Sequence, residues 1–270
     1  MVARGERKTV AAAAAGVGVG LVLTLVGPAA AIPIEGLSAG RSRLGPVSPP
    51  ASQTAAEPPL PADWILPSCS GPPVITTADP AAQWDSIVLD PVRGLPPGWA
   101  PDDLVEVPAL GTQTDAEVRE FVLEPLLAMH AAADAAGTPF DVVSGFRSQD
   151  RQDWVYQNAT EEPTTPDEPM MVAPPGHSEH QLGTTVDLVD PSDVSLTAVF
   201  ADTPAGAWVA KHAIDFGFVV SYPDGAQDES CYGWEPWHLR YVGPERAREM
   251  SASGLAPRTF LLLEAATTTS

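Results

Sequence analysis

The sequence has little positive charge. Its 270 residues include 14 Lys or Arg against 35 Asp or Glu, which gives a formal net charge of -21 at pH 7. Proteins that bind nucleic acid need clustered basic side chains to neutralise phosphates, and anionic lipid surfaces attract the same clusters. The composition therefore argues against a nucleic-acid partner and against a lipid surface, and the acidic side chains are interpreted as a source of solubility.

Long hydrophobic runs are also scarce. The longest candidate, residues 10–26, is uncharged and has about 17 residues, which is the lower limit for a membrane-spanning helix. It follows basic side chains within residues 4–8 and precedes three alanines at 29–31, an order typical of an export signal. We expect residues 1–31 to be a signal peptide, with an uncleaved membrane anchor as the alternative. No cysteine lies at the cleavage site, so a lipid anchor is not expected.

Export places the chain in the extracellular space, in the cell wall or on the outer face of the cytoplasmic membrane. The chain has only two cysteines, Cys69 and Cys231, and in an oxidising compartment they are expected to pair, the alternative being two free thiols. Residues 32–82 are crowded with proline and lack a sustained apolar period, which predicts a semi-extended spacer. A disulfide would attach the end of this spacer to the folded domain.

Residues 83–254 carry the signals of a globular domain, since 44% of the chain is hydrophobic and apolar periods alternate with turns. Thr114 and Glu117 form a capping-box pattern at the start of a helix that Pro125 should kink or split. Residues 255–270 are interpreted as a C-terminal tail. The predicted helices span 114–137, 148–157, 203–216 and 244–254, the predicted strands span 86–90, 140–147, 184–188, 218–223 and 238–243, and residues 159–176 are predicted to form a loop or flap.

Two short motifs combine histidines with carboxylates. GHSEHQLGTTVD contains His180 and Asp187, and EPWH begins at Glu235 and ends at His238. Two imidazoles and a carboxylate suit a zinc ion whose fourth position is left to water, and a further carboxylate beside that water can act as its general base. The alternative is a set of core and surface histidines that meet carboxylates by chance.

Together with SGFRS at residues 144–148, and with the later GF, YP and EPWHLRYVG motifs, these segments resemble the VanY-type D-alanyl-D-alanine carboxypeptidases. These are zinc peptidases that act on bacterial cell-wall peptides, and the resemblance covers about residues 84–250. It implies an α+β fold, in which a small antiparallel sheet with flanking helices forms a single zinc peptidase domain of the Hedgehog/DD-peptidase type.

The resemblance also assigns roles to individual side chains. It implies that His180, Asp187 and His238 bind a zinc ion (Zn2+), and that Glu235 is the general base. It implies that Arg147 polarises the scissile carbonyl and stabilises the oxyanion. The implied reaction is hydrolysis of the terminal D-Ala-D-Ala bond of a peptidoglycan stem peptide.

Other assignments stay open. Ser178 matches a family position near the substrate, and the terminal carboxylate of the substrate needs a partner such as Arg151, Arg240 or a backbone N–H. Thr185 departs from the alanine that the family usually has there. The alternatives to the implied activity are an L,D-carboxypeptidase, a dipeptidase or an endopeptidase acting on wall peptides, or a non-catalytic wall-binding module that contains zinc. The sequence gives no signal for the oligomeric state.

Overall fold

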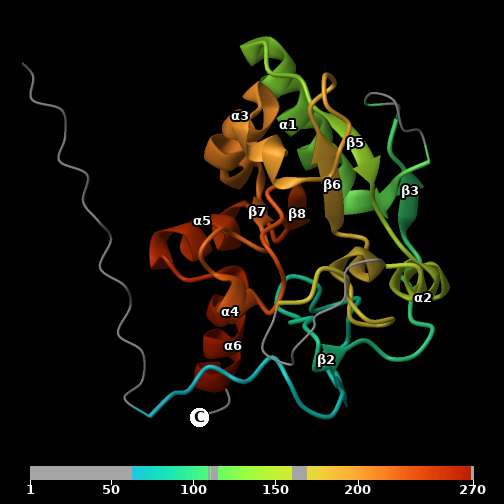
Figure 1. Ribbon diagram of the computed structural model, residues 1–270, viewed down its shortest axis with the longest axis vertical. Helices are drawn as coiled ribbons and strands as arrows, with labels where there is room; N and C mark the ends of the chain where they lie inside the picture. Colours follow the sequence, from blue (N-terminus) through green and yellow to red (C-terminus); the bar gives the residue numbers. More distant parts are fainter. Residues whose placement is uncertain (1–62, 109, 111–114, 160–168, 269–270) are drawn as a thin grey trace, which may run out of the picture. The chain divides into compact units, whose positions relative to one another are not determined.

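The computed structural model describes residues 63–108, 110, 115–159 and 169–268 (Figure 1). The predicted signal peptide and residues 32–62 of the predicted spacer lie outside this part of the chain. A four-stranded sheet with the order β5-β6-β8-β7 holds its centre, and every neighbouring pair is antiparallel. Its strands are β5 (Asp141–Ser144), β6 (Thr185–Val189), β7 (Phe218–Val220) and β8 (His238–Tyr241).

The two faces of this sheet have different chemistry because side chains alternate along a strand. On β6, Val186 and Leu188 are fully buried in the main hydrophobic cluster, whereas Thr185 and Asp187 belong to the other face. Asp187 lies directly opposite His238 in the register of β6 and β8, and opposite Ser144 of β5. The sheet therefore has one apolar face for packing and one face that carries polar side chains.

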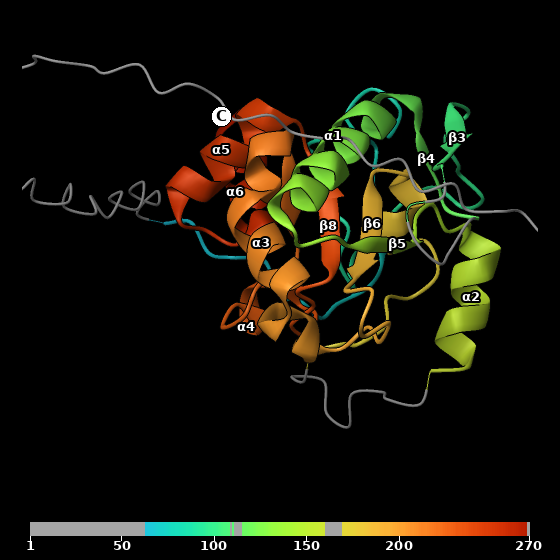
Figure 2. The same ribbon diagram turned by 90° about the horizontal axis from the view of Figure 1, so that it is seen from above.

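Helices α1 (Glu120–Ala136) and α3 (Pro204–His212) contribute to the apolar cluster (Figures 1 and 2). Burying these apolar side chains stabilises the fold by roughly 25 cal/mol per Å2 of area removed from water. The members from the two helices are Val122, Leu126, Met129, Ala133, Ala205 and Val209.

The remaining elements surround this centre. Two further small sheets pair β1 (Val74–Ile75) with β2 (Arg93–Gly94) in parallel, and β3 (Leu104–Glu106) with β4 (Glu117–Arg119) in antiparallel orientation. The other helices are α2 (Gln149–Gln157), α4 (Gln227–Ser230), α5 (Pro244–Ser253) and α6 (Pro257–Thr268), with 3-10 turns η1 (Glu179–Leu182), η2 (Ala198–Asp202) and η3 (Ala213–Phe216). No helix in the described ranges is long and apolar enough to cross a bilayer.

The start of α1 differs from the prediction. Residues 117–119 form strand β4 and the helix begins at Glu120, while Thr114 of the predicted capping box lies outside the described residues. Pro125 does not divide the helix, which continues to Ala136. It ends at Gly137, whose backbone is in the left-handed conformation (φ +76°). Proline has no backbone N–H, so the one hydrogen bond from residue 125 to the carbonyl of Phe121 is lost.

The predicted strand at 86–90 is also wrong, because residue 86 ends a turn, residues 87–89 have no regular structure and residue 90 lies in a bend. Two of its carbonyl groups are bound by side chains rather than by a neighbouring strand. The carbonyl of Ile87 accepts a hydrogen bond from Arg240, and the carbonyl of Asp90 lies 2.7 Å from Nδ1 of His177. These two carbonyls are therefore not available to a neighbouring strand.

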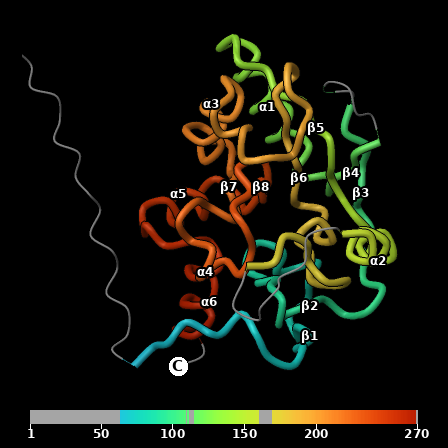
Figure 3. Tube along the Cα trace, in the orientation of Figure 1, coloured from blue at the N-terminus to red at the C-terminus, as the bar shows by residue number. Residues whose placement is uncertain are grey.

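Residues 63–82, assigned to the spacer by sequence, are attached to the domain (Figure 3). The predicted Cys69–Cys231 disulfide is present, and residues 74–75 pair with β2. Arg258 donates a hydrogen bond of 2.8 Å to the carbonyl of Pro67. Residues 257–268, assigned to a tail, instead form α6, whose Leu261 and Leu262 are buried. Burial of these apolar side chains explains why this segment is helical.

Candidate metal centre and active site

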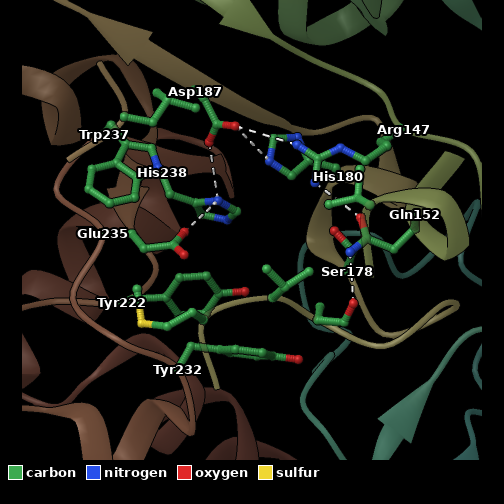
Figure 4. Close-up of a pocket in the computed structure, with 15 residues that line it drawn as sticks. Arg147, Gln152, Ser178, His180, Asp187, Tyr222, Tyr232, Glu235, Trp237 and His238 are labelled. Atoms are coloured by element: carbon green, nitrogen blue, oxygen red, sulfur yellow. Dashed lines mark hydrogen bonds and ion pairs between the residues drawn. The ribbon is translucent and has the colours of Figure 1, made fainter. Parts of the chain in front are cut away.

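Three side chains from two segments of the chain meet on the polar face of the sheet (Figure 4). Asp187 projects from β6 and His238 from β8, and their directly opposed positions bring the two side chains together. His180 belongs to η1, which ends at Gly183 with φ +71°. A Cβ there would lie 3.0 Å from Cγ of Arg119, so glycine meets both the backbone and the packing requirement of the turn into β6.

The donor atoms of these side chains are close together. Nε2 of His180 is 3.1 Å from Oδ2 of Asp187, and Nδ1 of His238 is 3.3 Å from Oδ1 of the same carboxylate. One donor atom from each of the three residues lies within 4.8 Å of the other two, and all three residues are buried. Such convergence fits a single divalent metal ion bound by two imidazoles and a carboxylate.

The hydrogen bonds of the two histidines leave opposite ring nitrogens for the metal. Nδ1 of His180 donates to the carbonyl of Gly145 at 2.7 Å, so Nε2 carries the lone pair. Nε2 of His238 lies 3.1 Å from the Glu179 carboxylate, which can only accept, so its Nδ1 faces Asp187. Oδ1 of Asp187 is buried and faces Nδ1 of His238 at 3.3 Å, so both atoms can serve as donors to one cation.

A carboxylate and a guanidinium lie beside this donor set. Oε2 of Glu235 is 3.4 Å from Nδ1 of His238, and Nη2 of Arg147 is 3.6 Å from Oδ2 of Asp187. Arg147 is held by hydrogen bonds to the side chains of Gln152 (3.0 Å) and Ser144 (3.1 Å). The five residues singled out as ligands, base and oxyanion partner all line one cavity of about 200 Å3.

The charges of the site shift the pKa values of its acids and bases. Burial lowers the pKa of His238, but hydrogen bonds to Asp187 and Glu179 and the charges of Asp187 and Glu235 outweigh this and raise it to about 10. Burial raises the pKa of Glu235 to about 7, and the Asp187 charge adds to the effect. For Asp187, burial is outweighed by the two histidines, which hold its pKa below the usual range. A base with a pKa near neutrality suits general acid–base chemistry.

Metal binding is expected to release protons. In the metal-free chain at about pH 8, His238 is protonated and Glu235 is mostly ionised, since their pKa values are about 10 and about 7. A metal at Nδ1 of His238 must displace that proton, so we expect at least about one proton released per zinc ion and an affinity that rises with pH. Calorimetric titration with zinc in buffers of different ionisation enthalpy measures this number. Zinc binding without proton release at pH 8 would contradict it.

The other candidates have different surroundings. Ser178 lines the cavity and is buried. Arg151 stacks over Trp154 at 4.2 Å outside the cavity lining, and Arg240 is bound to Glu179 and to backbone carbonyls behind the metal site. Arg240 is therefore not available to the substrate carboxylate, whereas Arg151 is exposed and lies outside the cavity lining. His177 lies close by in the sequence, but its Nδ1 bonds to the backbone carbonyl of Asp90.

The cavity also includes side chains that sequence reasoning did not select. Gln152 is buried on α2, accepts from Arg147, and donates to the carbonyl of Ala173 at 2.7 Å. Tyr222 stacks against His238 with ring centroids 4.6 Å apart, and Tyr232 lies beside it. The YP motif pointed to the first tyrosine, whereas a glutamine in a short polar helix carries no recognisable signal.

Thr185 offers a test of stability. Its hydroxyl is fully buried and has no hydrogen-bond partner among the described residues, and a buried unsatisfied polar group costs roughly 1–3 kcal/mol. Thr185→Val is therefore expected to raise the free energy of unfolding by about 1 kcal/mol. Denaturant titration measures the change. In the matched control Thr259→Val, where the hydroxyl donates to Glu229 at 2.7 Å, stability should fall instead. Destabilisation by Thr185→Val would show that this hydroxyl has a partner.

This sheet and this donor set define an α+β domain with a site suited to a divalent metal ion. Residues 115–244 match the family model described as "VanY: D-alanyl-D-alanine carboxypeptidase". The LdcB LD-carboxypeptidase is 30% identical, with a TM-score of 0.57 over 64% of this chain and 84% of that one. The chain belongs to the VanY family.

Other relatives support the same membership. YodJ of Bacillus subtilis is 34% identical over 167 residues, which cover 60% of this chain and 61% of YodJ. A D-alanyl-D-alanine carboxypeptidase of Enterococcus faecium is 34% identical over 104 residues, covering 38% of this chain and 30% of that enzyme. VanYB in complex with D-alanine-D-alanine is 25% identical, with a TM-score of 0.50 over 66% of this chain and 97% of VanYB. The chain thus covers less than two thirds of the length of YodJ and of the Enterococcus faecium enzyme.

Proposed function

We propose that this chain is a zinc-dependent carboxypeptidase that removes the terminal D-alanine from peptidoglycan stem peptides ending in D-Ala-D-Ala. The observation that carries the proposal is the convergence of His180, Asp187 and His238 within 4.8 Å, with Glu235 beside them in one cavity. Relatives named for D-alanyl-D-alanine cleavage, and a VanY relative whose structure contains Zn(II), support the substrate and the metal.

Each side chain has a distinct task in this proposal. Zinc, when bound, polarises the scissile carbonyl and lowers the pKa of a water molecule. Glu235 accepts a proton from the attacking water on its carboxylate and returns it to the leaving amine nitrogen of D-alanine. Arg147 stabilises the negative charge that develops on the carbonyl oxygen, a contribution in which one donor is commonly worth about 3 kcal/mol. Ser178 lines the cavity where the peptide would lie.

Cleavage of the L,D bond is the second candidate, because the LdcB LD-carboxypeptidase is the solved structure with 30% identity and a TM-score of 0.57. A pentapeptide stem ending in D-Ala-D-Ala and the corresponding tetrapeptide separate the two reactions. Release of free D-alanine from the pentapeptide alone, blocked by a chelator and restored by zinc, is the expected result. Release from the tetrapeptide alone would favour the L,D activity, and no release from either would contradict the proposal.

We further propose that the enzyme works outside the cytoplasm. The disulfide between Cys69 and Cys231 supports this location, since such bonds persist in oxidising compartments. The expected signal peptide and the wall-peptide substrate point the same way. Fractionation of cells that produce the full chain, with detection in the wall or medium, tests the location; retention in the cytoplasm would contradict it.

A further inference from the structure

A buried ion pair lies directly behind one of the proposed metal ligands. Oε2 of Glu179 is 3.1 Å from Nε2 of His238, and its other oxygen accepts a 2.8 Å hydrogen bond from Nη1 of Arg240. Only 6% of Glu179 and 2% of Arg240 is exposed, and neither lines the cavity that holds Glu235. The pair therefore contacts the ligand from the side opposite the substrate.

The arginine of this pair is fixed by the backbone. Nη2 of Arg240 donates to the carbonyls of Trp84 and Ile87, both at 2.8 Å. Arg240 lies two residues after His238 on β8, so both side chains are on the same face of the strand. The turn at 84–87 thus holds Arg240, Arg240 holds Glu179, and Glu179 contacts the imidazole.

We propose that Glu179 and Arg240 are positioning residues that fix the tautomer and the ring orientation of His238 for metal binding. An ionised carboxylate only accepts hydrogen bonds, so Nε2 of His238 must keep its proton and its Nδ1 lone pair must face Asp187. His180 is oriented differently, by the backbone carbonyl of Gly145. The inference rests on the proposed metal site, and it assigns a task to residues that touch neither substrate nor metal.

A purely structural role would look different, and the chain contains an example of one. Asp90 is fully buried, and its carboxylate accepts from Nε of Arg258 at 2.8 Å and from Nη1 of Arg93 at 2.7 Å. The Asp90 side chain contacts none of the three proposed ligands. This second buried carboxylate–guanidinium pair supplies a matched control, because its loss should affect folding without affecting the metal.

The test is zinc affinity, measured by competition with a chromophoric chelator on the full chain at a fixed pH. In Glu179→Gln only one terminal atom can accept, so the side chain cannot satisfy both His238 and Arg240. We expect zinc to bind about 10–100-fold more weakly, the range typical of residues that orient a metal ligand. Asp90→Asn should lower the unfolding midpoint and leave the zinc affinity within about twofold of the wild type.

The absorption spectrum of the cobalt-loaded protein gives a second readout. At saturating cobalt, Glu179→Gln should show shifted bands because the imidazole is held differently, whereas Asp90→Asn should match the wild type. If Glu179→Gln fails to fold, the double variant Glu179→Leu/Arg240→Met removes both charges together and is expected to show the same weakening of zinc binding.

Three results would overturn the inference: unchanged zinc affinity in the folded Glu179 variant, unchanged cobalt bands, or equal weakening by Asp90→Asn. The wild-type chain separates this failure from failure of the proposed function. If the wild type binds zinc and releases D-alanine while the Glu179 variant binds zinc equally well, only the positioning role is wrong. If the wild type binds no zinc, the proposed function and the inference fail together.

Discussion

Replacing Glu235 with alanine is expected to lower kcat by about 10³-fold or more while zinc remains bound. General acid–base groups contribute about 10²–10⁴-fold, and the carboxylate of Glu235 is placed to act on both the attacking water and the leaving amine. Zinc should remain because His180, Asp187 and His238 supply the donor set without Glu235. Loss of turnover with the metal retained is therefore the signature of a base rather than a ligand.

The measurement pairs D-alanine release with the zinc content of each purified variant. Glu249→Ala is the matched control, since Glu249 is an exposed carboxylate on α5 and should leave both quantities unchanged. A Glu235 variant that loses zinc together with activity would show that this carboxylate acts as a ligand. A variant that keeps its activity would remove Glu235 from the mechanism.

Replacing His180 with alanine is expected to abolish stoichiometric zinc binding. Only two protein donors would remain, so the affinity should fall by more than the ~10–100-fold seen when an orienting residue is changed. Activity should fall with it and should return only in part at high zinc concentration. The lost imidazole also leaves a void beside the buried Asp187, whose carboxylate would lack its 3.1 Å partner.

Zinc content after dialysis and chelator competition measure this loss. His212→Ala is the control, because His212 lies in the last turn of α3, next to Asp215 and away from the cavity. An unchanged zinc affinity in His180→Ala would mean that the metal is held elsewhere. Loss of zinc in the His212 variant would mean that general destabilisation releases the metal.

Elements with strong local signals could be predicted from the sequence. Ser148 caps α2 by accepting from the backbone N–H of Arg151, Thr203 caps α3 in the same way, and Gly217 ends the turn after it. Strand β6 follows from its β-branched run. These features depend on a few neighbouring residues, so sequence reasoning recovers them.

Elements that depend on distant partners could not be predicted. Residues 117–119 form a strand because 104–106 pair with them, which overrides a capping pattern. Residues 86–90 contain a run of apolar residues typical of a strand, yet their carbonyls bond to Arg240 and His177. Helix α6 is held by contacts that no local pattern records, such as Arg258 reaching the carbonyl of Pro67. Tertiary context decides these segments.

The residues of the proposed metal site could be predicted from the sequence for another reason. His180, Asp187 and His238 occur within two recognisable motifs, and the structure brings them together on β6, β8 and the adjoining η1. The roles of Glu179 and Arg240 could not be predicted from the sequence. They depend on contacts between the segments that contain Trp84, Glu179 and Arg240. The two motifs contain one of these residues each, but they do not indicate what either residue contacts.

The disulfide determines how mechanical load enters the domain. A pull on the chain before Cys69 passes through the covalent bond to Cys231, four residues before Glu235. The two-residue strand β1 follows Cys69, so this bond would hold the chain to the domain even if the pairing of β1 with β2 were broken. A pull on the N-terminal segment would thus reach the domain through a covalent bond four residues from the proposed base, in addition to the hydrogen bond that Arg258 donates to the carbonyl of Pro67.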